Sequence, residues 1–197
     1  MSKKFMMVLM SLMLAVPILA WAGQEDGKNF LKAQRDKIKA HVIKEKNENQ
    51  AVRESMKGKT AKEKKALWNE QKDKQYAQNQ AFREKIHQEN QVFLKAQMDK
   101  NNKLSEAQKK EFLTLFDSQY QDRTAIREEQ YNENVVFFDK IANDDTMTSS
   151  QKKDAIKAHF VEQKDVRKKF SEGQKEALKN GKEKVYSGTQ LPETVKN

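Results

Sequence analysis

Histidine is the side chain in this sequence best suited to catalysis or metal binding, and it occurs at three separate positions, His41, His87 and His159. No two of them have the i, i+4 spacing at which two imidazoles on one helix share a metal ion. His41 and His159 each end an Ile-Lys-Ala-His segment and could meet across a helical hairpin. Two half-buried or surface histidines are the simpler interpretation. With no cysteine in the chain, disulfides and thiolate sites are excluded, and we expect no metal site.

The carboxylates alternate with lysines, as in Glu63-Lys64, Glu84-Lys85 and Asp139-Lys140. On a helix this pattern is typical of a solvated face with many i, i+3 and i, i+4 pairs. A catalytic acid–base pair needs a partly dry, concave pocket. The sequence also has no Gly-rich phosphate loop and no G-x-S-x-G nucleophile motif. We therefore expect no enzyme, no catalytic residue and no cofactor.

The N-terminal segment, residues 1–22, is typical of a secretory signal peptide. Two lysines precede an apolar run over residues 5–20, and Ala20-Trp21-Ala22 fits an A-x-A cleavage site. An uncleaved anchor is the alternative, but the run is short for a membrane span and Pro17 interrupts it. We expect cleavage near Ala22 and a periplasmic or secreted protein. No cysteine follows the run, so no lipid anchor is expected.

The rest of the chain is predicted to be helical. There is no proline between Gly23 and Leu191, and good helix formers such as Lys, Glu, Gln and Ala predominate. Clusters of turn-forming residues divide the chain into helices near 26–57, 60–99, 105–142 and 148–180. These form a helical domain over 23–187, which a disordered tail follows at 188–197. The predicted fold is all-α, with about four long amphipathic helices as extended antiparallel hairpins that a second copy of the chain could complete.

Three predicted helices begin with the same signal, a hydroxyl residue followed three positions later by Glu or Gln. The pairs are Thr60 and Glu63, Ser105 and Gln108, and Thr148 and Gln151. In such a capping box each residue bonds the backbone N–H of the other, which fixes the start of the helix. Two lysines follow each box, at Lys64-Lys65, Lys109-Lys110 and Lys152-Lys153. Because the helix dipole disfavours cations there, the lysines could mark a binding surface, or duplication of one helix start could have copied them.

The apolar stripe of each helix is thin. In the third helix it is predicted to follow Phe112, Phe116, Tyr120, Ile126, Tyr131, Val135 and Phe138. Val135-Val136-Phe137-Phe138 cannot all face one core. Val136 or Phe137 is therefore a candidate for an exposed protein-binding patch or a dimer interface. Echoes such as Phe30-Leu-Lys-Ala-Gln34 and Phe93-Leu-Lys-Ala-Gln97 indicate internal duplication.

Two of the capping boxes also resemble a family signature. Leu104-Ser105-Glu106-Ala107-Gln108 is similar to the LTxxQ motif of the Spy/CpxP family of periplasmic stress proteins, and Met147-Thr148-Ser149-Ser150-Gln151 resembles a second copy. Serine and methionine replace the motif's threonine and leucine at 105 and 147. The resemblance implies an all-α homodimer that binds unfolded proteins without ATP or acts as an envelope-stress adaptor. One branch of that family senses metals, so the resemblance also allows a metal sensor.

The charge balance points to acidic partners. The chain has a formal net charge of +10, and the lysines and arginines are spread along it rather than gathered in one nucleic-acid groove. We expect binding to unfolded or envelope proteins, peripheral contact with anionic lipid or lipopolysaccharide, and no nucleic acid. The candidate surface comprises Val136, Phe137, Lys109, Lys110, Lys152 and Lys153. Two alternatives remain open: a structural or adaptor protein without client binding, and a trimeric Skp-type holdase, whose sheet body would need strands.

Overall fold

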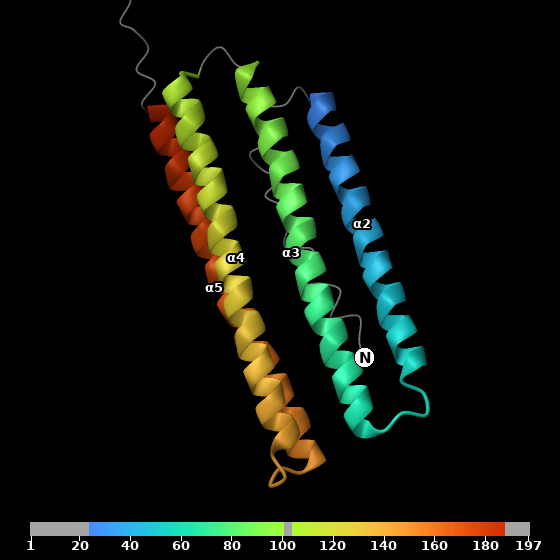
Figure 1. The fold of residues 1–197 in the computed structure, drawn as a ribbon. Coiled ribbons are helices and arrows are strands. Elements are labelled where there is room, and N and C mark those ends of the chain that lie inside the picture. Colours follow the sequence, from blue (N-terminus) through green and yellow to red (C-terminus); the bar gives the residue numbers. More distant parts are fainter. Residues whose placement is uncertain (1–23, 101–103, 188–197) are drawn as a thin grey trace, which may run out of the picture. The chain divides into compact units, whose positions relative to one another are not determined.

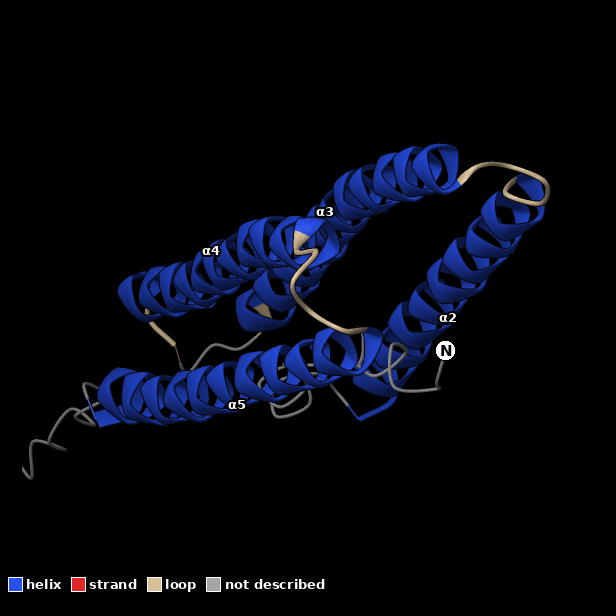
Figure 2. Cartoon of the chain, turned by 90° about the horizontal axis from the view of Figure 1, so that it is seen from below, coloured by secondary structure: helices blue, strands red, loops and turns tan. Residues whose placement is uncertain are grey.

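The computed structural model describes residues 24–100 and 104–187. They form four helices, α2 (Gln24–Ser55), α3 (Ala61–Asp99), α4 (Glu106–Asn143) and α5 (Ser149–Ser187) (Figure 1). No strand occurs among these residues, and Figure 2 shows helices joined by loops. The prediction of an all-α chain is therefore confirmed. The expected signal peptide, 1–22, and the expected tail, 188–197, lie outside the described residues.

The chain divides into two units, residues 1–102 and 103–197. In the first, α2 packs against α3, and in the second, α4 packs against α5; we refer to these as the N-terminal pair and the C-terminal pair. Each pair is antiparallel. In the N-terminal pair, Asp26 near the start of α2 contacts Lys100 after α3, whereas Glu45 bonds Asn79 in the middle of α3.

The turn between α2 and α3 depends on a glycine. Gly58 has a φ of +73°, a left-handed conformation that disfavours other residues. The amides of Met56 and Lys57 still bond carbonyls of the last turn of α2. Thr60 then caps α3, and its reciprocal bonds with Glu63 form the predicted capping box.

Helix α5 is longer than the sequence indicates. The sequence predicts an end near residue 180, directly before Gly181, but the helix continues to Ser187. Gly181 lies directly against the side chain of Leu115 on α4, where an added Cβ would collide with a Leu115 methyl group. A residue that looks like a helix terminator therefore permits close packing of two helices.

The cores of both pairs are thin and mix apolar residues with glutamines. The buried apolar residues are Leu31, Ile86, Leu94 and Met98 in the N-terminal pair, and Leu104, Phe112, Phe116, Ile141 and Leu178 in the C-terminal pair. Among them lie Gln34, Gln71 and Gln97 in the first pair, and Gln119, Gln130, Gln163 and Gln174 in the second. Amide side chains thus occupy much of each helix interface.

Beyond Phe116 the expected stripe of α4 lies beside the most buried face, with Tyr120, Ile126, Tyr131 and Phe138 half-buried, and it is wrong at Val135. The buried face continues through Gln119 and Gln130 to Ile141, whereas Val135 is exposed. Steps of three and four from Phe116 lead to these glutamines. The expected stripe followed the aromatic residues and so drifted off the helical period. None of the described helices is both long and apolar enough to cross a membrane.

Candidate functional site

A histidine, an asparagine and a phenylalanine meet inside each helix pair, near the middle of α2 and α3 in the first and toward the turn between α4 and α5 in the second. In the N-terminal pair, Nε2 of His41 lies 2.9 Å from Oδ1 of Asn79, and the imidazole stacks on Phe82 with ring centroids 4.0 Å apart. In the C-terminal pair, Nε2 of His159 lies 2.9 Å from Oδ1 of Asn134, and its ring stacks on Phe137 at 4.0 Å. Both histidines are half-buried. They belong to different pairs, so they do not meet within one hairpin.

A glutamine one turn before each asparagine extends the cluster. Nε2 of Gln75 donates to the carbonyl of Glu45 over 3.2 Å, and Nε2 of Gln130 donates to the carbonyl of Gln163 over the same distance. The accepting residue follows the histidine by four positions in both cases. These bonds tie a side chain of one helix to the main chain of the other and fix the register of each pair.

The same cluster recurs because the sequence of both helices recurs. Residues 75–86 read QYAQNQAFREKI and residues 130–141 read QYNENVVFFDKI, which share Gln, Tyr, Asn, Phe, Lys and Ile at matching places. This repeat was missed in the sequence analysis, although its length and fixed spacing could have revealed it. The histidines lie on α2 and α5, within the two Ile-Lys-Ala-His segments, and the asparagines lie on α3 and α4. The histidine helix therefore comes first in the N-terminal pair and second in the C-terminal pair.

In both clusters the imidazole bonds an asparagine of the facing helix. Nδ2 of Asn79 donates to Oε1 of Glu45, so Oδ1 of Asn79 is the acceptor and Nε2 of His41 the donor. The partner of the imidazole in each cluster is thus a neutral amide. The third histidine, His87, is buried on α3. Among the described residues, no three His, Asp or Glu side chains gather as metal ligands.

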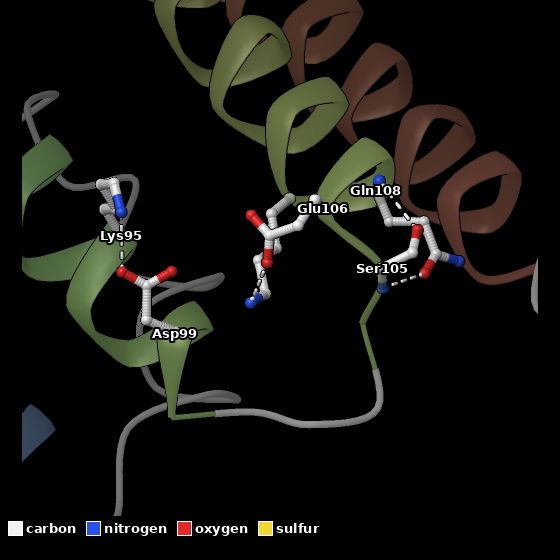
Figure 3. A network of polar contacts seen from close by, with 6 residues as sticks. Lys95, Asp99, Ser105, Glu106 and Gln108 are labelled. Atoms are coloured by element: carbon white, nitrogen blue, oxygen red, sulfur yellow. Dashed lines mark hydrogen bonds and ion pairs between the residues drawn. The ribbon is translucent and has the colours of Figure 1, made fainter.

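The residues of the LTxxQ-like motif cap helices. Ser105 N donates to Oε1 of Gln108 over 2.9 Å, and Gln108 N donates to the Ser105 hydroxyl over 3.2 Å (Figure 3). Thr148 and Gln151 exchange the corresponding bonds at the start of α5. Leu104 is buried and Met147 is half-buried. Each predicted capping box is therefore present, and the motif residues are engaged within the helix ends.

The candidate lysines of the C-terminal pair form two doublets, Lys109-Lys110 and Lys152-Lys153. One lysine in each doublet has an intramolecular contact. Nζ of Lys109 lies 2.7 Å from Oε1 of Glu106, and its side chain is only 14% exposed. Nζ of Lys152 donates to the carbonyl of Ala142 over 3.4 Å, where the C-terminal end of α4 attracts a cation. Lys110 and Lys153 are exposed. The first lysine of each doublet thus contacts a helix end, and the second faces solvent.

The structure separates the two apolar candidates of α4. Val136 is 69% exposed, whereas Phe137 is half-buried against His159. Phe137 therefore belongs to the helix interface rather than to an exposed binding patch, because it follows Asn134 by three positions on the inner face. Beside it, Phe138 contacts Phe160 across the pair at 5.8 Å, and Phe160 is partly exposed.

Further large apolar side chains are exposed on both pairs. They are Ile43 and Val92 in the N-terminal pair, and Val135, Phe160, Val161 and Val166 in the C-terminal pair. Lysines or arginines lie within one helical turn of most of them, such as Lys39 and Lys46 beside Ile43. The exposed surface therefore offers small apolar contacts, most of them within one helical turn of a positive charge.

Among the described residues, hydrogen bonds and burial shift the pKa of five side chains. Bonds from Thr60 lower the pKa of Glu63, and bonds from Thr146 lower that of Asp144. The bond from Lys37 is the largest cause that lowers the pKa of Glu89. Burial lowers the pKa of the Arg123 and Arg167 guanidinium groups, which stay positively charged at neutral pH. All five shifts arise at caps, turns and the helix interface.

Comparison with protein-family models, with curated proteins and with solved structures gives no match for this chain.

Proposed function

We propose that this protein is an ATP-independent chaperone or envelope-stress adaptor of the periplasm that binds unfolded or partner proteins through its outer helical surface. The observation that carries the proposal is the set of exposed aliphatic side chains on both helix pairs, most of which lie within one helical turn of a lysine or arginine. A binding surface that releases its client without ATP needs weak, adaptable contacts. Single aliphatic residues beside mobile charges supply contacts of this kind.

The thin, amide-rich core also supports a role at the surface. Glutamines occupy interface positions in both pairs that apolar residues would fill in a deep core. The histidines are held by asparagine and phenylalanine within each pair, which leaves them to a structural task. The signal-peptide pattern and the LTxxQ-like motifs agree with a periplasmic stress protein, and the homodimer expected from that resemblance is part of the proposal.

Suppression of insulin aggregation tests this function. Insulin aggregates when its disulfides are reduced, and the reductant leaves a chain without cysteine chemically unchanged. The chain from Gly23 onward should delay light scattering at substoichiometric amounts, without nucleotide. The delay should shorten as salt is raised, because screening weakens the lysine contacts.

A second outcome would favour the structural alternative. If a several-fold excess of the folded chain leaves the scattering curve unchanged at low and moderate salt, the protein is not a chaperone. It would then be a helical spacer or adaptor without client binding. Far-ultraviolet circular dichroism of the same sample verifies that the helices are formed.

A further inference from the structure

Helices α2 and α5 carry the same row of exposed side chains on the face turned away from the partner helix. We call these the outer rows. The outer row of α2 comprises Asp36, Lys39, Ala40, Ile43 and Lys46, and that of α5 comprises Asp154, Lys157, Ala158, Val161 and Lys164. Four of the five positions are identical, and the fifth holds Ile43 in one row and Val161 in the other.

The two rows also have the same geometry. Lys39 pairs with Asp36 at 3.6 Å, and Lys157 pairs with Asp154 at 3.1 Å. The aliphatic residue is 58% exposed in α2 and 59% exposed in α5. In both rows one lysine precedes it by four positions and another follows it by three, which puts both lysines within one turn of it.

Packing explains why the inner faces of the copies agree, but it does not explain the outer rows. His41 and His159 are retained where they contact the facing helix. An exposed helical position has no such constraint, and a β-branched residue there slightly disfavours the helix. Drift is visible on the other two helices, where exposed Ala77 and Ala81 of α3 correspond to Asn132 and Val136 of α4.

We propose that the outer rows of α2 and α5 are two equivalent docking sites for a polypeptide segment that presents an aliphatic side chain beside carboxylates. Ile43 or Val161 contacts the aliphatic group, and the lysines on either side meet the carboxylates. Lys46 and Lys164 are exposed and have no hydrogen bond or ion pair with a described residue, so their charges are available to a partner. This inference rests on the proposed function and names where, and with what chemistry, the partner binds.

Charge and width select this occupant over two others. Each row carries two lysines and one aspartate, so a second copy docked row against row would bring lysines against lysines. A helix that lies in a membrane surface needs a broad apolar face, whereas each row has one large aliphatic residue and includes an aspartate. A carboxylate-bearing polypeptide complements both the charge and the size of the rows.

Amide chemical-shift mapping tests the proposal on the ¹⁵N-labelled chain from Gly23 onward. The probe is the blocked peptide Gly-Glu-Glu-Leu-Leu-Glu-Glu-Gly, and the control peptide has lysine at each glutamate. The acidic peptide should shift resonances of residues 39–46 and 157–164 with similar dissociation constants, and the basic peptide should shift neither. Ile43→Gln should raise the dissociation constant of the α2 site about tenfold and leave the α5 site unchanged. Val161→Gln should do the reverse.

Val92→Gln is the matched control, because Val92 is the most exposed of these aliphatic residues, at 72%, yet lies in neither row. It should change neither site. The proposal is overturned if the acidic peptide shifts only one row, shifts other residues instead, or does not bind. It is also overturned if anionic phospholipid vesicles protect both rows from the peptide at equal lipid and peptide concentrations. Insulin protection by the Ile43→Gln/Val161→Gln variant equal to that of the unchanged chain would refute the rows but leave the chaperone function standing.

Discussion

His41 and Phe82 stack with their ring centroids 4.0 Å apart and their planes 1° from parallel. His159 and Phe137 repeat this relationship in the C-terminal pair, with the helices in the opposite order along the chain. A contact present in both pairs, with its asparagine and glutamine neighbours, identifies the cluster as the element that sets the register of each pair. The following predictions test this element and the helix ends.

His159→Ala should lower the free energy of unfolding of the C-terminal pair by about 2 kcal/mol. The variant loses a ring stack of about 1 kcal/mol and a hydrogen bond of about 1 kcal/mol. Amide hydrogen exchange measures the effect on α4 and α5 separately from α2 and α3. Asn134→Ala in the same background should add little, because its partner is already absent. Full additivity of the two substitutions would contradict the bond between them.

Gln71→Leu should stabilise the N-terminal pair by about 1 kcal/mol. Gln71 is buried and its Nε2 has no hydrogen-bond partner in the described structure, so leucine removes an unsatisfied group and adds apolar contact. Gln130→Leu is the matched contrast. Its amide bonds Gln163 and accepts from Arg167, so the same change should destabilise the C-terminal pair by about 2 kcal/mol. Urea unfolding of both variants decides the sign; equal effects would refute the distinction.

Ser105→Ala should destabilise the start of α4 by about 1 kcal/mol, because the hydroxyl that accepts from Gln108 N is lost. Ser105→Asp should retain the stability, since aspartate is an equally good cap. Ser118→Ala, at an exposed position inside α4, serves as the control and should be neutral. Hydrogen exchange of the first turn of α4 reports the difference. If Ser105→Asp keeps the cap but abolishes protection of insulin, the motif has a task beyond capping.

Acid should destabilise the N-terminal pair through Glu89. Bonds from Lys37 and Gln34 lower its pKa in the folded protein. A lowered folded pKa contributes stability above the unfolded value of about 4.3, and that stability is lost as the pH falls through the folded value. The urea concentration at the unfolding midpoint of the unchanged chain should therefore decrease as the pH is lowered below about 4.3. The midpoint of Glu89→Gln should decrease less. Parallel acid limbs for the two proteins would show that Glu89 is not responsible.

The sequence predicted the helix starts well and the helix interface poorly. Thr60, Ser105 and Thr148 carry local signals, since a capping box needs only residues within one turn. The interface depends on which face meets the other helix, and polar Gln119 and Gln130 are buried there more deeply than the half-buried Tyr120 and Tyr131. Glutamine is usually expected on the protein surface. The burial of Gln119 and Gln130 is explained only by their hydrogen bonds to the carbonyls of Gln174 and Gln163 on the facing helix.

Of the two apolar candidates for a binding surface, one is exposed in the structure and the other lies in the helix interface. Val136 is exposed as a surface residue must be, whereas Phe137 turns inward to His159. The helical period from Asn134 could have placed Phe137 on the inner face if the repeat of residues 75–86 at 130–141 had been recognised. The outer rows of α2 and α5 could not be identified from the sequence alone. Residues that are identical in two repeats can lie in a core or on a surface, and only their exposure in the structure shows which.

The most direct measurement for the whole account is equilibrium binding of an unfolded acidic protein, reduced and carboxymethylated serum albumin, compared with the same albumin in its native state. We predict that the chain from Gly23 onward binds the unfolded form without nucleotide. Its dissociation constant should rise with salt, and the native form should not bind. Absence of binding to the unfolded form at low salt, or equal affinity for both forms, would contradict a surface that recognises exposed aliphatic groups beside carboxylates.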